Sequence, residues 1–155
     1  MEKVRIDDVD GWMGPADVKR PLGRELGTED VAINYFELAP GESFAFGYHR
    51  HADQEEVFYV QRGTVAFETA DGELPVEAGE AVRFAPGEYQ QGWNRGDERV
   101  VALAIGAPAE SGETEILREC ADCGDRTPQR IEPTDDRSAL VTLCEGCGAE
   151  TGRFT

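Results

Sequence analysis

Both histidines of the chain lie in one short step, His49-Arg50-His51, and Glu56 follows five residues after the second histidine. On an extended strand, side chains two residues apart point to the same face, so both imidazoles can address one point. Residues 56–60 are typical of the next strand, and the first of them can bring a carboxylate to that point. Two imidazoles and one carboxylate are a ligand set for a divalent transition metal with open positions. His49, His51 and Glu56 are therefore candidate metal ligands.

The segments that must position these residues are short strands separated by turns. Gly and Pro signals such as Pro40-Gly41, Arg62-Gly63 and Pro86-Gly87 mark the turns. No amphipathic helix is predicted between them. Eight strands in succession favour an all-β fold, either a closed antiparallel barrel or a jelly roll, because closure removes sheet edges. The predicted strands are 31–38, 43–51, 56–61, 64–69, 73–77, 81–84, 90–94 and 99–107.

The motif spacing of residues 31–107 resembles that of the cupin superfamily. The first cupin motif ends in H-x-H, three or four residues, E, six residues and G, and this chain matches it with His49, His51, Glu56 and Gly63. Three positions of the second motif are also matched, by Gly79, Gly87 and Asn94. The resemblance implies a small single-barrel cupin, that is, a double-stranded β-helix or jelly-roll barrel.

The chain departs from the cupin pattern at three positions. Gly41 stands eight residues before His49 instead of six, and Ala85 stands where a proline is expected. The third departure is Gln90, which stands where the family has its third metal-ligating histidine. The resemblance therefore implies a barrel site made of His49, His51, Glu56 and Gln90.

Gln90 has two possible roles at this site. Its amide oxygen can ligate Fe, Mn, Ni or Zn, although less strongly than an imidazole does. Alternatively, its amide NH groups donate hydrogen bonds to a metal-bound water or to a substrate oxygen. Some cupins have lost the metal altogether, and the former ligands then serve as buried polar groups. Gln91, the next residue, is expected to point away from the site when Gln90 points in.

Strand parity also predicts which apolar side chains surround the site. Phe58 and Val60 share the parity of the candidate carboxylate, so they form either an apolar wall of a pocket or ordinary barrel core. Phe44, Phe46 and Tyr48 have the opposite parity to the first histidine. These three aromatic residues are expected to lie off the ligand face unless a bulge intervenes.

All four cysteines of the chain lie in two C-x-x-C-G segments near the C-terminus, at Cys120, Cys123, Cys144 and Cys147. This spacing resembles that of a zinc ribbon, in which four thiolates close a tetrahedral shell around a structural zinc ion. The glycine after each segment lets the backbone turn back so that amides face the sulfurs. Two disulfides or a redox pair are the competing interpretations.

The expected organisation is an N-terminal arm (1–30), the barrel (31–107), a linker (108–113) and a zinc-ribbon-like domain (114–155). The arm can contribute a strand that packs on the barrel or on a partner.

The charge balance argues against nucleic acid as a partner. The chain has 32 Asp+Glu and 15 Lys+Arg residues, so its net charge is −17, and only Lys3 and Lys19 are lysines. Such a surface repels polyanions, and nucleic-acid binding is not expected. An acidic, lysine-poor composition predicts a protein made for high intracellular salt, as in a halophilic archaeon. No apolar run reaches the length of a membrane span and no secretion signal is recognisable, so we expect a cytoplasmic protein.

The function that these features predict is metal-dependent binding of a small oxygenated molecule. The first hypothesis is a mononuclear-metal enzyme, dioxygenase-like or isomerase-like. The second is a non-catalytic ligand-binding or regulatory cupin whose zinc ribbon mediates protein contacts, and the third is an interaction module with an empty barrel. The resemblance also implies a homodimer formed through a barrel face.

Overall fold

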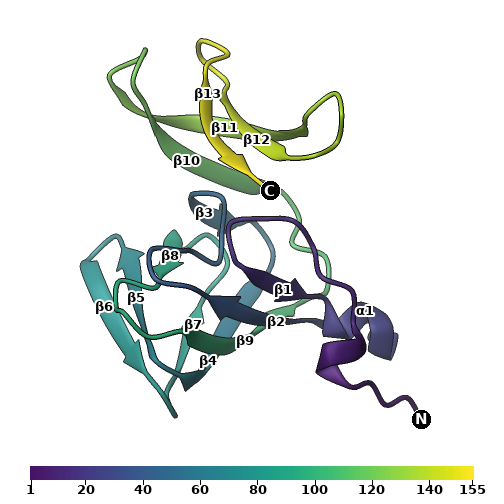
Figure 1. The fold of residues 1–155 in the computed structure, drawn as a ribbon. Helices are drawn as coiled ribbons and strands as arrows, with labels where there is room; N and C mark the ends of the chain where they lie inside the picture. The colour runs from purple at the N-terminus through teal and green to yellow at the C-terminus, as the bar shows by residue number, and fades with distance from the viewer.

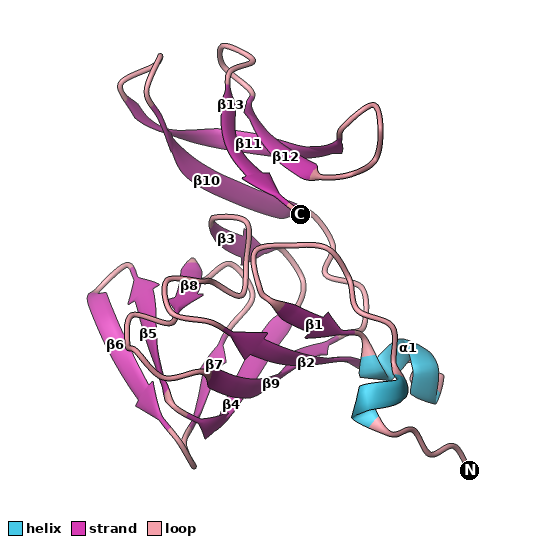
Figure 2. Ribbon diagram, viewed as in Figure 1, coloured by secondary structure: helices cyan, strands magenta, loops and turns pink.

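Short antiparallel strands make up most of the structure, a computed structural model that describes all 155 residues (Figures 1 and 2). Eight of the strands form the barrel, in two sheets that face each other. Four of these strands, with β1 of the N-terminal segment, form the order β1-β2-β9-β4-β7, and the other four lie in a second sheet that ends β3-β8-β5-β6. The barrel strands are β2 (Ala32–Leu38), β3 (Tyr48–His51), β4 (Glu55–Arg62), β5 (Thr64–Thr69), β6 (Gly72–Glu77), β7 (Ala81–Phe84), β8 (Gln90–Trp93) and β9 (Val100–Ala107).

Aromatic rings from both sheets fill one part of the barrel. The rings of Phe58 and Phe67 are 5.0 Å apart between centroids, and those of Phe67 and Phe84 are 5.2 Å apart. Alternate residues of β9, among them Val100 and Ala102, point into the same core and are almost fully buried. These are the side chains that the two-residue period of a half-buried strand predicts to face inward.

Gly63 makes the tight turn between β4 and β5. Its φ of 77° lies in the left-handed region, which residues with a side chain rarely adopt. A Cβ atom there would also stand 3.0 Å from Cγ2 of Val100. The turn that joins the candidate carboxylate strand to the next strand therefore requires glycine, as the motif spacing indicates.

The N-terminal segment packs on the barrel through β1 (Val18–Arg20). This strand pairs antiparallel with β2, with Lys19 opposite Phe36. The guanidinium of Arg20 donates hydrogen bonds to the carbonyl oxygens of Ile6 and Val9, which holds the preceding loop against the strand. A single helical turn at η1 (Ile6–Asp8) and a short helix α1 (Leu22–Leu26), which the sequence pattern does not predict, complete the segment. None of the helices has the length and apolar character needed to cross a membrane.

The C-terminal region continues one sheet of the barrel. Its strands β10 (Thr114–Cys120), β11 (Asp125–Pro133), β12 (Leu140–Cys144) and β13 (Glu150–Phe154) form an antiparallel meander. β10 pairs with β3, so that Thr114 lies opposite His51 and Ile116 lies opposite His49. The two regions are therefore joined by backbone hydrogen bonds along the strand that carries both histidines (Figure 1).

The expectation of a continuous strand over residues 43–51 is wrong. Only Tyr48–His51 is a strand, residues 44–47 form a bend, and Ser43 makes an isolated bridge to Trp93. The backbone at Gly47 passes so close to the C-terminal region that a Cβ atom there would stand 2.6 Å from the carbonyl oxygen of Leu117. Because the chain bends here, strand parity does not apply to the residues before Tyr48.

Candidate metal centre and cavity

Three neighbouring strands bring the predicted barrel residues together. His49 and His51 lie on β3, Glu56 lies at the start of β4, and Gln90 is the first residue of β8. β3 and β8 are antiparallel, with His49 directly opposite Gln90. Directly opposed residues of paired strands project from the same face of the sheet. The pairing thus explains why a residue 41 positions away from the first histidine in sequence reaches the same site.

The donor atoms of these residues converge on one point. Oε2 of Glu56 lies 3.4 Å from Nε2 of His51 and 3.8 Å from Nε2 of His49. The candidate donor atoms of the two imidazoles and the carboxylate all lie within 4.8 Å of one another. Separations of this size allow all three atoms to reach one ion at ordinary bond lengths of about 2.0–2.2 Å.

The far side of each imidazole is held by an oxygen atom. Nδ1 of His49 lies 3.1 Å from the carbonyl oxygen of Gly47, and Nδ1 of His51 lies 2.8 Å from Oγ1 of Thr114. A carbonyl oxygen only accepts hydrogen bonds, so Nδ1 of His49 carries the proton and Nε2 keeps its lone pair. This is the arrangement that metal-binding histidines adopt, because the outer hydrogen bond fixes the tautomer and the ring orientation.

Gln90 closes the fourth side of the cluster. In the structure its Nε2 donates a hydrogen bond to Oε2 of Glu56 at 2.9 Å and lies 3.2 Å from Nε2 of His49. Its Oε1 is buried and has no hydrogen-bond partner. Rotating the amide group by half a turn would place the oxygen beside the other acceptors, which is favourable only when a cation lies between them. The unpaired amide oxygen and the donor set therefore fit a divalent metal ion.

Gln91 points away from the cluster, as predicted. It donates hydrogen bonds to Oγ of Ser43 and to the carbonyl oxygen of Ala45. Two adjacent buried glutamines thus have different roles, one at the candidate centre and one in holding the bend before β3.

The carboxylate of Glu56 is strongly stabilised in its ionised form. Burial by itself raises the pKa of Glu56, but interactions with the nearby imidazoles of His49 and His51 outweigh burial and lower the pKa to about 2. Glu56 is therefore an anionic oxygen donor at neutral pH.

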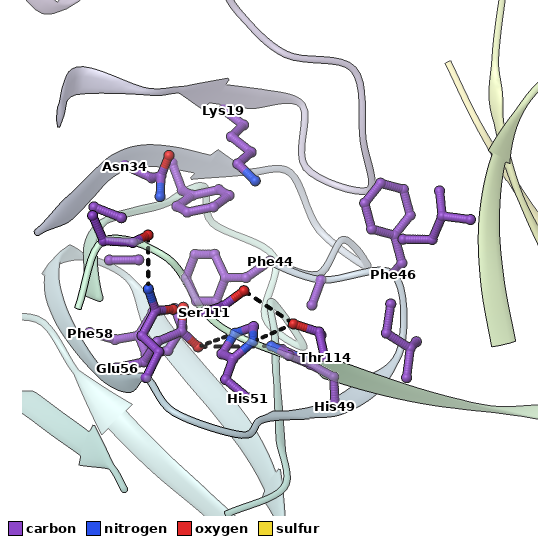
Figure 3. A pocket seen from close by; sticks show the side chains of 18 residues that line it. Lys19, Asn34, Phe44, Phe46, His49, His51, Glu56, Phe58, Ser111 and Thr114 are labelled. Atoms are coloured by element: carbon purple, nitrogen blue, oxygen red, sulfur yellow. Dashed lines mark hydrogen bonds and ion pairs between the residues drawn. The ribbon is translucent and has the colours of Figure 1, made fainter. Parts of the chain in front are cut away.

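The cluster opens into a cavity of about 420 Å³ between the two sheets (Figure 3). Much of its wall is apolar, with the rings of Phe36, Phe44, Phe46 and Phe58 along it. Small residues of four different segments leave the space open: Ala32, Ala45, Ala104 and Ala109. Cavities of this size and character are typical of small-molecule sites.

Part of this cavity comes from residues that strand parity did not predict. Phe44 and Phe46 line it, because the bend before β3 turns them inward; the expectation that they lie off the ligand face assumes an uninterrupted strand and does not apply here. Tyr48, on the regular strand, lies elsewhere, where its ring stacks on that of Tyr89 at 5.1 Å. Phe58 is both core and cavity wall, whereas Val60 belongs to the core alone.

Two polar residues that line the cavity lie on neighbouring strands of the five-stranded sheet, Lys19 on β1 and Asn34 on β2. The two-residue alternation along β2 could have indicated Asn34, since Ala32, Asn34 and Phe36 share one parity and all line the cavity. The C-terminal region supplies Thr114, Ile116 and Ile131, which no local pattern identifies because they reach the cavity only through the pairing of β10 with β3.

The four cysteines form a second cluster at the tip of the C-terminal region. Sγ of Cys120 lies 3.5 Å from Sγ of Cys147, and Sγ of Cys123 lies 3.8 Å from Sγ of Cys144. All four sulfur atoms lie within 4.8 Å of one another. Zinc–sulfur bonds of about 2.3 Å place the sulfurs of a tetrahedron roughly 3.8 Å apart. The spacing of the thiols therefore fits one tetrahedral ion.

The two C-x-x-C-G segments have the same backbone geometry. Gly124 and Gly148 have φ values of 72° and 79°, and their amides donate hydrogen bonds to the carbonyl oxygens of Cys120 and Cys144. A hydrogen bond from the hydroxyl of Thr127 lowers the pKa of the Cys144 thiol, and backbone amides that face its sulfur act in the same direction. The predicted turning of amides toward sulfur is thus present around Cys144, where it favours the thiolate.

Comparison with known proteins agrees with the barrel geometry. Residues 34–106 match the family model of the cupin domain. This segment contains β2 to β9 except for the first two residues of β2 and the last of β9, so it carries the entire candidate metal centre. Residues 34–106 are therefore similar to the cupin domain, and the predicted all-β double-stranded β-helix fold is confirmed. No curated protein matches the chain in sequence.

Several solved structures share this fold at low sequence identity. A sugar phosphate isomerase of the cupin superfamily from Silicibacter pomeroyi is 21% identical with a TM-score of 0.63, over 99% of this chain and 92% of that one. The polyketide cyclase RemF from Streptomyces resistomycificus is 22% identical with a TM-score of 0.64, over 79% and 89% of the two chains. A predicted oxalate decarboxylase from Thermotoga maritima is 20% identical with a TM-score of 0.60, over 69% and 99%. The activities in these names differ, so the likeness defines the fold and not the reaction.

Proposed function

We propose that the protein binds a divalent transition metal at His49, His51 and Glu56 and uses it to hold a small oxygenated ligand in the adjoining cavity. The observation that carries this proposal is the convergence of two Nε2 atoms and one carboxylate oxygen where the cavity begins. Gln90 would supply a fourth, neutral oxygen donor. Fe, Mn, Ni and Zn all accept such a mixed nitrogen and oxygen set.

The cavity supports a role in binding or converting a small molecule. When bound, the metal would supply Lewis-acid or redox chemistry. The chain's own residues would do the rest: phenylalanine rings would exclude water and contact the apolar part of the ligand, and Asn34 and Thr114 would offer hydrogen bonds to its oxygen atoms. The named activities of the similar structures, sugar phosphate isomerisation among them, also concern small oxygen-rich compounds. An enzyme of the isomerase-like or dioxygenase-like kind is therefore our first choice.

Metal titration of chelator-treated protein by calorimetry tests the proposal, with Glu56→Ala as the test variant. We expect it to lose at least 100-fold in affinity for the barrel metal, because a charged ligand is removed. Glu55→Ala is the matched control: the neighbouring carboxylate pairs with Arg83 at the exposed surface and should not affect binding. Equal metal affinity in both variants would contradict the proposal.

A non-catalytic ligand-binding barrel is the second candidate, and one observation favours it. The side-chain amide of Gln90 already donates a hydrogen bond to Glu56 and lies within hydrogen-bond distance of His49, so the cluster can persist without an ion. In that case the protein would bind its ligand through hydrogen bonds alone, and ligand affinity would not change when chelator removes metal.

We further propose that the four cysteines hold a structural zinc ion. Four thiolates close the coordination shell, so no position remains for a substrate. The ion would stabilise the far end of a region whose near end lines the cavity with Ile131 and contacts His51 through Thr114. Its role would thus be to shape the site, and it could also support protein contacts. A cytoplasmic location in a halophilic cell and a homodimer stay predictions.

A further inference from the structure

One charged group of the cavity has no partner within the protein. Lys19 points its ammonium group into the cavity (Figure 3). It takes part in no ion pair and no side-chain hydrogen bond, and its nearest aromatic contacts are the rings of Trp12 and Phe36, each 5.5 Å from Nζ to the centroid. An aromatic face stabilises a cation less than a hydrogen-bonded carboxylate does. The ammonium therefore keeps its capacity to bind an anion.

This lack of a partner contrasts with the rest of the chain. Carboxylates outnumber cations by 32 to 15, and eight arginines form ion pairs with them. The other lysine, Lys3, is exposed near the N-terminus. Among the 18 residues that line the cavity, only Lys19 and Glu56 ordinarily carry a full charge at neutral pH. A scarce cation is thus directed into the cavity beside the candidate metal centre.

Keeping Lys19 in this position has a cost that an anion would remove. Burial lowers the pKa of Lys19, and the negative charge of Glu56 offsets part of this effect. A partly desolvated ammonium without an acceptor is unfavourable, since it loses hydration and gains no hydrogen bond in return. An anionic group beside Nζ would supply both the opposite charge and the acceptors.

The remaining lining residues indicate how such a ligand would lie. Asn34 is on the strand paired with β1, and its side-chain amide makes no hydrogen bond within the protein. Lys19 and Asn34 occupy one side of the cavity in Figure 3, and the ring of Phe44 lies between them and the two histidines. A ligand that spans the cavity would meet polar groups at both ends and aromatic rings between them.

We propose that Lys19 is the anion-binding residue of the cavity, and that the ligand carries a carboxylate or phosphate group at the end opposite the His49, His51 and Glu56 cluster. Both groups offer the charged oxygen atoms that an ammonium binds. The strongly acidic surface repels anions, so a local cation is needed for such a ligand to enter. This inference rests on the proposed function in one respect: the other end of the ligand is taken to bind at the metal held by His49, His51 and Glu56.

Two matched pairs of compounds test the inference by calorimetry: ribose 5-phosphate against ribose, and malate against lactate. Each pair differs by one anionic group, and the pairs separate phosphate from carboxylate. We expect the more anionic member of one pair to bind at least about tenfold more tightly than its partner. Lys19→Gln should abolish that preference, whereas Lys3→Gln, which removes the only other lysine, should retain it.

A second measurement reports on the lysine directly. Reductive methylation with ¹³C labels the two lysines and the N-terminal amine, so the carbon NMR spectrum contains few signals and the Lys19→Gln variant assigns one of them. The ribose 5-phosphate or malate that calorimetry selects should shift the Lys19 signal and leave the Lys3 signal in place. Chelator-treated protein gives the same readout without the barrel metal.

The inference is overturned if neither pair shows a preference, if Lys19→Gln keeps the preference, or if the Lys3 signal moves as much as the Lys19 signal. Metal content, measured on the same samples, separates this failure from that of the proposed function. A Lys19-dependent preference in protein that contains no barrel metal when purified without chelator would contradict the metal proposal and support the anion site.

Discussion

Gln90 is the residue at which this barrel centre departs from the cupin pattern, which has a metal-ligating histidine there. It stands opposite His49 on the paired strand, where its amide reaches both His49 and Glu56. An amide oxygen is a neutral and weaker ligand than an imidazole, so a metal held here would be bound less tightly and would exchange its other ligands more readily. This residue therefore determines how open the centre is.

Replacing the glutamine with a third imidazole should tighten metal binding. We expect Gln90→His to raise the affinity for Zn or Ni by about tenfold or more, since nitrogen is the better donor for these ions. Calorimetric titration of chelator-treated protein measures the change. Gln91→His is the control, because that side chain points to Ser43 instead. A similar gain from both variants would show that the gain arises outside the centre.

At the scale of elements, the pairing of β10 with β3 links the candidate metal centre to the C-terminal region. Thr114 lies opposite His51 in this pairing, and its hydroxyl bonds the outer nitrogen of that histidine. A strand from outside the barrel thus helps to orient His51, a candidate metal-binding residue inside the barrel. Groups that hold a metal-binding histidine in this way commonly affect metal affinity.

We predict that Thr114→Val weakens the barrel metal by roughly 10–100-fold while the fold is retained, because valine has a similar shape and no hydroxyl. Ser111→Ala serves as control, since the hydroxyl of Ser111 contacts Thr114 but not His51. Metal affinity and circular dichroism of both variants check the prediction. Unchanged affinity in Thr114→Val would mean that the ring of His51 is positioned without its outer hydrogen bond.

Strand periodicity predicts some elements of this fold and misses others for identifiable reasons. The strands at Thr64–Thr69 and Ala81–Phe84 end where the sequence pattern predicts, because turn glycines or buried alternation define them locally. The bend at residues 44–47 is missed because it depends on the close approach of Gly47 to β10, which is a tertiary contact. The three candidate ligands of the centre lie close together in sequence and could be predicted. Lys19 and Thr114 could not, since sheet pairing alone brings them to the cavity.

At the scale of the whole molecule, one continuous sheet joins the strands next to the cysteine cluster to β3, which borders the cavity. The eight-stranded order runs from β13 through β10 and β3 to β6. Loss of order at the cysteine end would therefore remove Ile131 and Thr114 from the cavity while leaving the phenylalanine core of the barrel in place.

We predict that Cys120→Ser loses the zinc ion and the order of the C-terminal region, while the barrel stays folded, because the metal supplies the folding energy of such small regions. Proteolysis followed by mass spectrometry should map cleavage to residues after 113. Asp122→Ala, an exposed substitution within the same knuckle, should remain resistant. Cooperative unfolding of the whole chain in Cys120→Ser would contradict independent stability of the barrel.

The central claim is that the barrel holds a metal ion, and the metal content per chain tests it most directly. Elemental analysis should use protein purified in high salt, without chelator and without a polyhistidine tag. Two ions per chain are predicted, one of them zinc and the other absent from His51→Ala, since that variant removes one of the converging donors. A single zinc ion that the His51→Ala change leaves in place would contradict the account.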